Sequence, residues 1–409
     1  MSVLVALLYS LLEPLLRADV IFTFLTTGAL LYKRYQRRKY ERGVAARKAR
    51  ANTIGEGLDA RELPLESALR PYQPVPGAPT SLLMKRAPQT PLLGFKDSLG
   101  LEICVYHWPA TKGYTSTQGG KRVAPRGVVI LAHGLDLNVE SEWSLRPGHH
   151  WEGSWIQGFC DAGFDVYGWD HHSMGRSESV CTSNLRSQCF DYFDYVDVLI
   201  QLRYLIGQRY HKENEEKGEP LLPIFLQGQS MGGLVSVLAA QKHPELFSGL
   251  SVNCPALHLE KIKKKSTNKV LLPMLRVLEF FVPHLRVAKK EPHPIQAIVA
   301  EATKLGSPMF NPGKNIPVLY AGETLRKADI SMKGEHIMRL KQLPTFWAHS
   351  EVDPFVDYTG TQIVTDMLRS AKADVTLFDE FEEGAHDIVQ TKDGPRVLAA
   401  VVKWMLARV

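Results

Sequence analysis

Cysteine is scarce in this chain, and its few cysteines follow no pattern. The five residues are odd in number and scattered, and no two of them stand in a C-x-x-C spacing, which argues against a disulfide framework. None of the eight asparagines stands in an N-x-[ST] sequon. Both absences favour a reduced protein whose folded part faces the cytosol.

The chain also lacks a charge imbalance outside its first fifty residues. Residues 1–50 contain ten Lys/Arg and three Asp/Glu, a net charge of +7. The rest holds the remaining 39 of 49 basic and 40 of 43 acidic side chains, a net charge of −1. A folded part without basic excess predicts no nucleic-acid partner. With 44% hydrophobic and 22% charged residues, the composition is typical of a globular protein.

No apolar run reaches the ~20 residues that cross a bilayer. The run 20–32 is followed directly by a basic cluster, residues 33–50, which is typical of the cytoplasmic side of a membrane and of binding to anionic lipids. No positive segment precedes the first apolar run, so a signal peptide is not predicted. We therefore predict that residues 1–50 are a membrane anchor, spanning or interfacial. A buried N-terminal helix pair and an organelle-targeting presequence are the alternatives.

Residues 51–90 are rich in proline and without apolar period, which predicts a linker. From residue 91 onward, short apolar runs alternate with helical patterns, which predicts an α/β fold with a doubly wound, mostly parallel sheet. Residues 256–342 interrupt this alternation, and we predict that they form a cap inserted between two strands. The predicted strands are 101–108, 127–132, 164–169, 224–226, 250–254, 344–348 and 375–378.

Ser230 stands between an apolar strand pattern and a helical pattern, within the sequence Gly228-Gln-Ser-Met-Gly232. The spacing G-x-S-x-G is that of a nucleophile elbow, a turn so tight that backbone approaches backbone. Gly228 and Gly232 leave the room that such a turn requires. Capping of the helix by the serine hydroxyl is the simpler alternative. The context favours Ser230 as a nucleophile.

A serine hydroxyl needs a base within hydrogen-bond reach and a carboxylate that orients the base. Candidates should follow later strands, because the acid and the histidine come after the serine in this arrangement. Asp353 follows the strand 344–348, with Glu351 and Asp357 as rivals, and His386 follows the last strand. His349 ends the earlier strand and is better placed for a structural role.

Stabilising a tetrahedral oxyanion requires two preorganised donors. The N–H of Met231 is the first, since it follows the nucleophile at a helix N-terminus. The second should come from the loop after the strand 127–132, where Leu135 follows His133 and Gly134. We expect Gly134 to permit close approach of the backbone and His133 to brace the loop.

Four stretches together resemble the monoacylglycerol lipase and lysophospholipase group of the α/β-hydrolases: Ala132-His-Gly134, Gly228-Gln-Ser-Met-Gly-Gly233, His349-Ser-Glu-Val-Asp353-Pro and Gly384-Ala-His386. Residues 167–177 resemble the G-x-D-x-x-G-x-G-x-S loop of that group. The resemblance covers residues 91–409, although the loop 137–155 is longer than its family counterpart. It implies an α/β-hydrolase fold with a nucleophile, its two partners and two oxyanion donors at Ser230, Asp353, His386, Leu135 and Met231.

The resemblance also implies the chemistry: a serine hydrolase that cleaves a lipid ester, a monoacylglycerol or lysophospholipid. Together with the predicted anchor, which has no counterpart in the resemblance, this predicts a membrane-associated enzyme at an endomembrane or lipid-droplet surface. The resemblance implies neither a metal nor an organic cofactor. The pairs His149-His150 and His171-His172 do not alter this, because adjacent side chains diverge and no carboxylate accompanies them at metal spacing. The alternatives are another carboxylesterase, a thioesterase, an acyltransferase, or a non-catalytic binding protein of the same fold.

Overall fold

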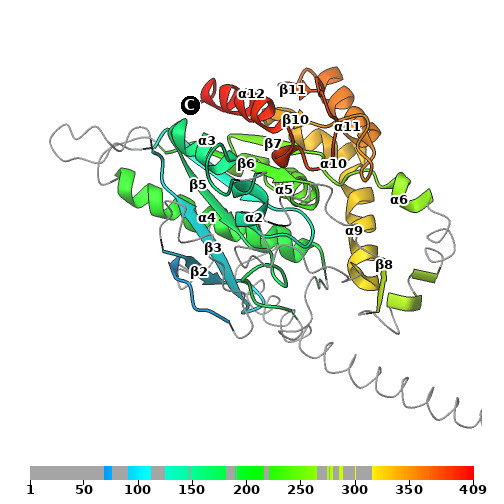
Figure 1. The fold of residues 1–409 in the computed structure, drawn as a ribbon, viewed down its shortest axis with the longest axis horizontal. Coiled ribbons are helices and arrows are strands. Elements are labelled where there is room, and N and C mark those ends of the chain that lie inside the picture. The colour runs from blue at the N-terminus through cyan, green and yellow to red at the C-terminus, as the bar shows by residue number, and fades with distance from the viewer. Residues whose placement is uncertain are drawn as a thin grey trace, which may run out of the picture.

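The structure is a computed structural model. It describes residues 69–75, 91–111, 125–146, 149–180, 189, 191–215, 221–264, 274–275, 277–279, 285–288, 300 and 316–409. Among these, nine strands form one sheet in the order β1-β2-β3-β5-β4-β6-β7-β10-β11 (Figure 1). Their bounds are Arg70–Pro71, Leu93–Lys96, Glu102–Trp108, Gly127–Ala132, Phe164–Trp169, Ile224–Gln229, Gly249–Asn253, Thr345–Ala348 and Val375–Phe378 for β1 to β7, β10 and β11.

The centre of the sheet is parallel. β4 lies between β5 and β6, and these neighbouring strands run in one direction: β5, β4, β6, β7, β10 and β11. β1, β2 and β3 add an antiparallel edge. All six residues of β4 are buried, as its continuous apolar run predicts for a strand covered on both faces. The predicted doubly wound, mostly parallel sheet is confirmed.

Helices cover both faces of this sheet (Figure 1). One buried apolar cluster lies beneath α2, α3 and α12, and a second lies beneath α4, α5 and α11. The two clusters therefore make separate cores on opposite faces of the β-layer. The helix bounds are Val139–Ser144 for α2, Trp155–Asp161 for α3, Phe193–Glu215 for α4, Met231–Lys242 for α5, Tyr358–Ser370 for α11 and Gly394–Leu406 for α12.

The antiparallel edge extends into the predicted linker 51–90. Arg70 pairs with Gly94 in the register of β1 and β2, and its guanidinium donates to the buried Glu102 carboxylate at 2.8 Å. Residues 69–75 therefore belong to the folded sheet. The remainder of the linker prediction lies outside the described residues.

The predicted insertion 256–342 lies between β7 and β10, which are neighbouring parallel strands. Its described parts are α6 (Glu260–Lys264), β8 (Arg286–Ala288), β9 (Ile316–Pro317), α9 (Val318–Ser331) and α10 (Gly334–Met338). In Figure 1, α9 stands at one end of the sheet, beside β8. The predicted anchor 1–50 lies outside the described residues, and no helix among the described residues is long and apolar enough to cross a membrane.

Candidate active site

Ser230 occupies the corner between β6 and α5. Its backbone has φ 53° and ψ −113°, a strained conformation for a residue with a side chain. A Cβ atom on Gly232 would lie 2.2 Å from the Ala132 carbonyl oxygen, and one on Gly228 would lie 2.5 Å from the Gly232 carbonyl oxygen. Glycine is therefore required at both positions. The local sequence folds into the predicted elbow and presents the Ser230 hydroxyl at the carboxyl end of the sheet.

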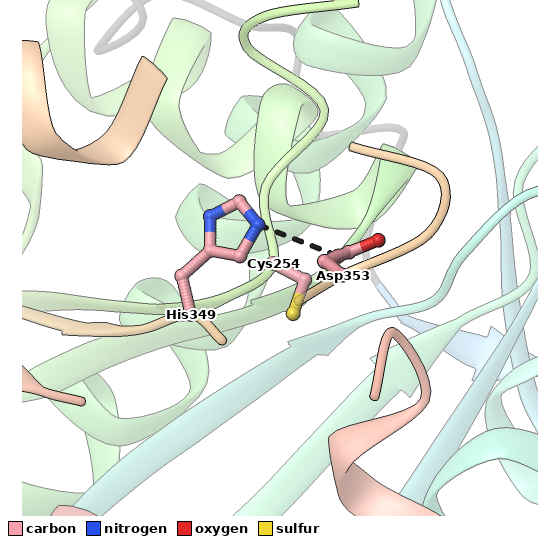
Figure 2. Close-up of side chains that lie close together, drawn as sticks. All are labelled: Cys254, His349 and Asp353. Atoms are coloured by element: carbon pink, nitrogen blue, oxygen red, sulfur yellow. Dashed lines mark ion pairs between the residues drawn. The ribbon is translucent and has the colours of Figure 1, made fainter. Parts of the chain in front are cut away.

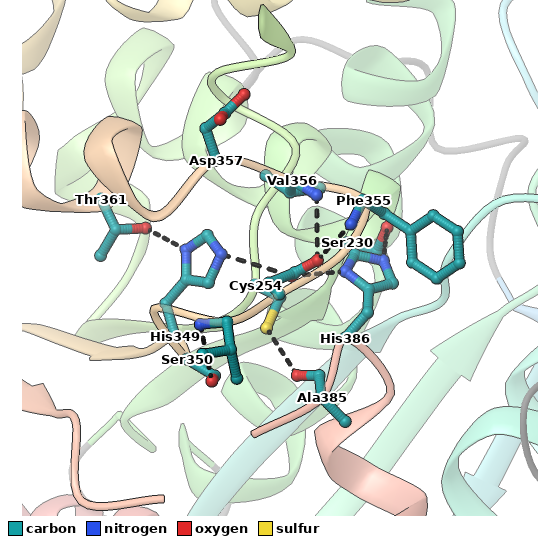
Figure 3. A network of polar contacts seen from close by, with 12 residues as sticks. Ser230, Cys254, His349, Ser350, Phe355, Val356, Asp357, Thr361, Ala385 and His386 are labelled. Atoms are coloured by element: carbon teal, nitrogen blue, oxygen red, sulfur yellow. Dashed lines mark hydrogen bonds and ion pairs between the residues drawn. The ribbon is translucent and has the colours of Figure 1, made fainter. Parts of the chain in front are cut away.

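His386 meets Ser230 from another loop (Figure 3), and Asp353 meets His386 from a third. The Nε2 atom of His386 lies 2.8 Å from Ser230 Oγ, and its Nδ1 atom lies 2.7 Å from Asp353 Oδ2. Asp353 follows β10, and His386 follows β11, so the carboxyl ends of parallel strands bring the three side chains together. This geometry allows a proton to pass from Ser230 to His386 while Asp353 holds the imidazole.

The structure distinguishes Asp353 from its two rivals. Its Oδ1 atom accepts the N–H groups of Phe355 and Val356 at 2.7 and 2.9 Å, which fixes the carboxylate. Asp357 instead accepts the Lys261 N–H at 2.8 Å, and Glu351 is exposed. The turn after β10 therefore aims only one of these three carboxylates at His386.

The contact between Asp353 and His386 sets the protonation of both side chains. Burial raises the pKa of Asp353, but the hydrogen bonds from His349 and His386 outweigh it and hold the pKa far below its usual range. Burial lowers the pKa of His386, but the hydrogen bond and charge of Asp353 raise it above its usual value. The carboxylate is thus ionised at neutral pH and supports a basic imidazole.

The two predicted oxyanion donors belong to segments that meet at Ser230. Met231 is the first residue of α5, so its N–H has no acceptor within the helix. Leu135 lies in a turn that Asp136 closes with a left-handed φ of 59°. A Cβ atom on Gly134 would lie 3.6 Å from Ser230 Cβ, which shows how closely this turn approaches the nucleophile. The segments that carry Met231 and Leu135 therefore meet at the nucleophile, and an oxyanion hole made by their two N–H groups stays a prediction.

Buried polar side chains hold the oxyanion turn. His133 Nδ1 donates to the Gly134 carbonyl oxygen at 2.8 Å, while its Nε2 accepts the His171 N–H at 3.0 Å. Burial lowers the pKa of His133, so the imidazole is neutral, as this pattern of one donor and one acceptor requires. The position of His133 agrees with the expected bracing role.

Sequence reasoning missed Glu142 in the turn. Its buried carboxylate accepts the Gly134 N–H at 2.6 Å. Glu142 belongs to the loop 137–155, whose unusual length was the only available signal. The loop 137–155 therefore supports the oxyanion turn through the Glu142 carboxylate.

Cys254, His349 and Asp353 form a second buried cluster beside the triad (Figure 2). Their donor atoms lie within 4.8 Å of one another, which is close enough for a metal ion. However, burial and the charge of Asp353 raise the pKa of the Cys254 thiol well above its usual value, so the thiolate that a metal needs is disfavoured. Cys254 instead donates to the Ala385 carbonyl oxygen at 3.6 Å, and Asp353 already serves His386. This donor set does not fit a metal site.

The family model described as serine aminopeptidase, S33, matches residues 123–393, more than half of the chain. The chain belongs to this family. The match includes the elbow, the oxyanion turn and the loops that carry Asp353 and His386. The expected resemblance to lipases of the α/β-hydrolases is confirmed by individual relatives as well.

Two relatives are lipases. The monoacylglycerol lipase of Mycolicibacterium smegmatis is 23% identical over 288 residues, 69% of this chain and 89% of that protein. The monoglyceride lipase of Rattus norvegicus is 27% identical over 237 residues, 58% of this chain and 70% of that protein. Together with the family match, these relatives identify a serine ester hydrolase that is similar to monoglyceride lipases.

Solved structures show the α/β-hydrolase fold. A soluble variant of the monoglyceride lipase of Saccharomyces cerevisiae has a TM-score of 0.57 at 17% identity, covering 83% of this chain and 98% of that one. The monoacylglycerol lipase of Paleococcus ferrophilus has a TM-score of 0.54 at 18% identity, covering 75% and 99%. The predicted fold is therefore confirmed.

Proposed function

We propose that this hydrolase cleaves the ester of a monoacylglycerol or lysophospholipid through an acyl-enzyme on Ser230. The observation that carries the proposal is the continuous hydrogen-bonded series from Ser230 Oγ through His386 to Asp353, at 2.8 and 2.7 Å. The substrate class is supported by the monoglyceride lipases among the relatives.

The first half of the reaction forms the acyl-enzyme. Ser230 Oγ attacks the ester carbonyl carbon while its proton passes to His386 Nε2. Asp353 stabilises the resulting imidazolium and holds its orientation. The carbonyl oxygen, now an oxyanion, accepts the N–H groups of Leu135 and Met231. His386 then gives the proton to the alcohol oxygen, and the glycerol or glycerophospho alcohol leaves.

The second half repeats these steps with water as nucleophile. His386 takes a proton from water, the hydroxide adds to the acyl carbon, and Ser230 leaves after receiving the proton. The two backbone donors serve both tetrahedral intermediates. The free fatty acid is then released. The cycle consumes one water molecule and returns Ser230 and His386 to their starting protonation.

Residues 256–342 act in this proposal as a cap over the acyl group. α9 packs on the elbow, where the Tyr320 hydroxyl lies 2.5 Å from Met231 Sδ, and the Tyr192 hydroxyl donates to the Met231 carbonyl oxygen at 3.3 Å. Three large apolar side chains of the cap are half exposed: Met274, Val277 and Leu285. Such side chains favour contact with a lipid surface.

Fatty-acid release from a 1-monoacylglycerol and from a lysophosphatidylcholine in liposomes tests the reaction. We expect hydrolysis of at least one lipid by the full chain and loss to background in Ser230→Ala. Ser236→Ala is the matched control, since Ser236 is a buried serine on α5, the helix that begins directly after Ser230, and it should retain activity.

A separate assay with an aminoacyl p-nitroanilide tests the peptidase activity that the family description names. A folded chain that cleaves neither lipid contradicts the proposal.

We further propose that residues 1–50 bind the membrane and place the hydrolase on its cytosolic side. Each basic residue near an anionic surface contributes about 1 kcal/mol of attraction. We therefore expect flotation with anionic liposomes to fall at least about tenfold when five residues of the basic cluster are replaced together. The variant carries Lys33→Gln, Arg34→Gln, Arg37→Gln, Arg38→Gln and Lys39→Gln.

The control for flotation makes the same charge change on the folded body. It replaces five exposed residues with glutamine: Lys341, Arg369, Lys372, Lys392 and Lys403. Equal loss of flotation in both variants would mean that net charge, rather than residues 1–50, directs binding.

A further inference from the structure

Asp353 has two imidazole rings on the same carboxylate oxygen. Its Oδ2 atom lies 2.7 Å from His386 Nδ1. The same atom lies 3.3 Å from His349 Nε2, the ion pair drawn in Figure 2. The side chains of His349 and Asp353 are both completely buried. Burial of this kind strengthens each polar contact, because no water competes for the oxygen.

Thr361 sets the orientation of His349. The Oγ1 atom of this buried threonine on α11 lies 2.7 Å from His349 Nδ1 (Figure 3). If Nδ1 carried the proton, the lone pair of Nε2 would face the carboxylate and repel it. The favourable alternative has the threonine hydroxyl donating to Nδ1, which leaves the imidazole proton on Nε2, the ring nitrogen that lies 3.3 Å from Asp353 Oδ2.

We infer that His349 is a positioning residue: oriented by Thr361, it places its Nε2–H beside Asp353 Oδ2 and withdraws part of that carboxylate's charge from His386. The inference rests on the proposed catalytic triad. Without the second donor, the full charge of Asp353 would act on His386, and the base would hold its proton to higher pH. The carboxylate would also lose one of the contacts that fix it.

Other charged and titratable groups face Asp353, His386 or His349 from several elements, and all of them are retained in the variants below. Differences between variants therefore report on His349 and Thr361 alone. These groups are Asp387 on the loop of His386, Cys254 after β7, Lys261 of α6 at the Asp353 backbone oxygen, and Tyr358 of α11 against the His349 ring.

The test measures kcat/KM for p-nitrophenyl butyrate from pH 5 to pH 9 with the full chain. The acid limb of this profile reports the pKa of the base in the free enzyme. For His349→Leu we expect this limb to move up by about one pH unit and kcat to fall about tenfold. His349→Gln should restore both, because its amide N–H can occupy the place of Nε2.

Thr361→Val isolates the hydroxyl with almost no change in volume. It should move the acid limb in the same direction as His349→Leu. Thr365→Val is the matched control, because Thr365 is equally buried on α11 but bonds to the Gln362 carbonyl oxygen of its own helix. It should leave the profile unchanged.

An unmoved acid limb in both His349→Leu and Thr361→Val would overturn the inference and leave His349 a packing residue. If His349→Leu does not fold, Thr361→Val and His349→Gln decide. Failure of the proposed triad is a separate result: the wild type and Ser230→Ala would then cleave the ester equally. In that case the inference fails with it.

Discussion

At the scale of single residues, the site depends on how one carboxylate is shared and how one imidazole is charged. Asp353 accepts from two backbone N–H groups through one oxygen and contacts His386 and His349 through the other. A carboxylate with so many donors remains ionised. Its charge then decides the pH at which His386 can act as a base.

The first prediction concerns that pH. His386 must be neutral to accept the Ser230 proton, and its pKa is raised above the ordinary 6.5. Ester hydrolysis should therefore fall as the pH drops through a midpoint above 6.5. Asp353→Asn should lower kcat by about 10⁴-fold and move the remaining acid limb downward, because the anion that supports the imidazolium is gone. A pH–rate profile with a midpoint below 6 in the wild type would contradict this.

At the scale of elements, a buried ion pair holds α2 against the loop that follows β5. Arg176 on that loop donates to Glu140 of α2 at 2.7 Å, and their side chains are 5% and 3% exposed. Asp170 accepts the N–H groups of Arg176 and Val139 at 2.7 and 3.1 Å. Burial raises the pKa of Glu140, and Arg176 opposes that rise. The position of α2 thus depends on a compensated ion pair.

The second prediction is that Arg176→Met lowers the free energy of unfolding by about 3–5 kcal/mol, because Glu140 remains buried without its partner. The pKa of Glu140 should rise further, so the folded state binds a proton that the unfolded state releases. Stability of this variant should therefore decrease as the pH rises.

Urea denaturation at several pH values measures this effect. The control is the double variant Arg176→Met with Glu140→Gln, which removes the unpaired charge. It should recover part of the lost stability and most of the lost pH dependence. Equal losses in the single and double variants would show that packing, rather than charge, holds α2.

At the scale of the whole molecule, the site lies where the carboxyl ends of parallel strands meet and both cores support them. The antiparallel edge adds residues that precede the family match. Arg70 and the Gln73 N–H both contact the buried Glu102 carboxylate, at 2.8 and 3.2 Å. The folded unit therefore includes a segment that the composition assigns to a linker.

The third prediction compares chains that begin at residue 69 and at residue 76. The shorter chain leaves Glu102 buried without Arg70 and exposes the edge of β2. We expect its melting temperature to be lower by at least about 2 °C. Arg70→Met in the longer chain should reproduce much of this decrease. Equal melting temperatures would mean that β1 adds nothing to stability.

The sequence by itself determined the features that depend on neighbouring residues. The G-x-S-x-G spacing predicts a strained corner at Ser230, because the steric limit at Gly228 comes from Gly232 in the same turn. The apolar run of β4 predicts a buried central strand for the same kind of reason. The order of serine, acid and histidine places the candidates Asp353 and His386 after their strands.

Only the tertiary structure decided between residues of the same type and joined those far apart in the chain. Asp353 rather than Glu351 or Asp357 faces His386, because the turn after β10 aims one carboxylate inward. Glu142 on α2 reaches the Gly134 N–H in the turn after β4, and β1 pairs with β2 although the proline-rich composition there predicts a linker. His349 likewise meets Thr361 on another element. Such contacts depend on how elements pack against one another, and no local period or spacing encodes that.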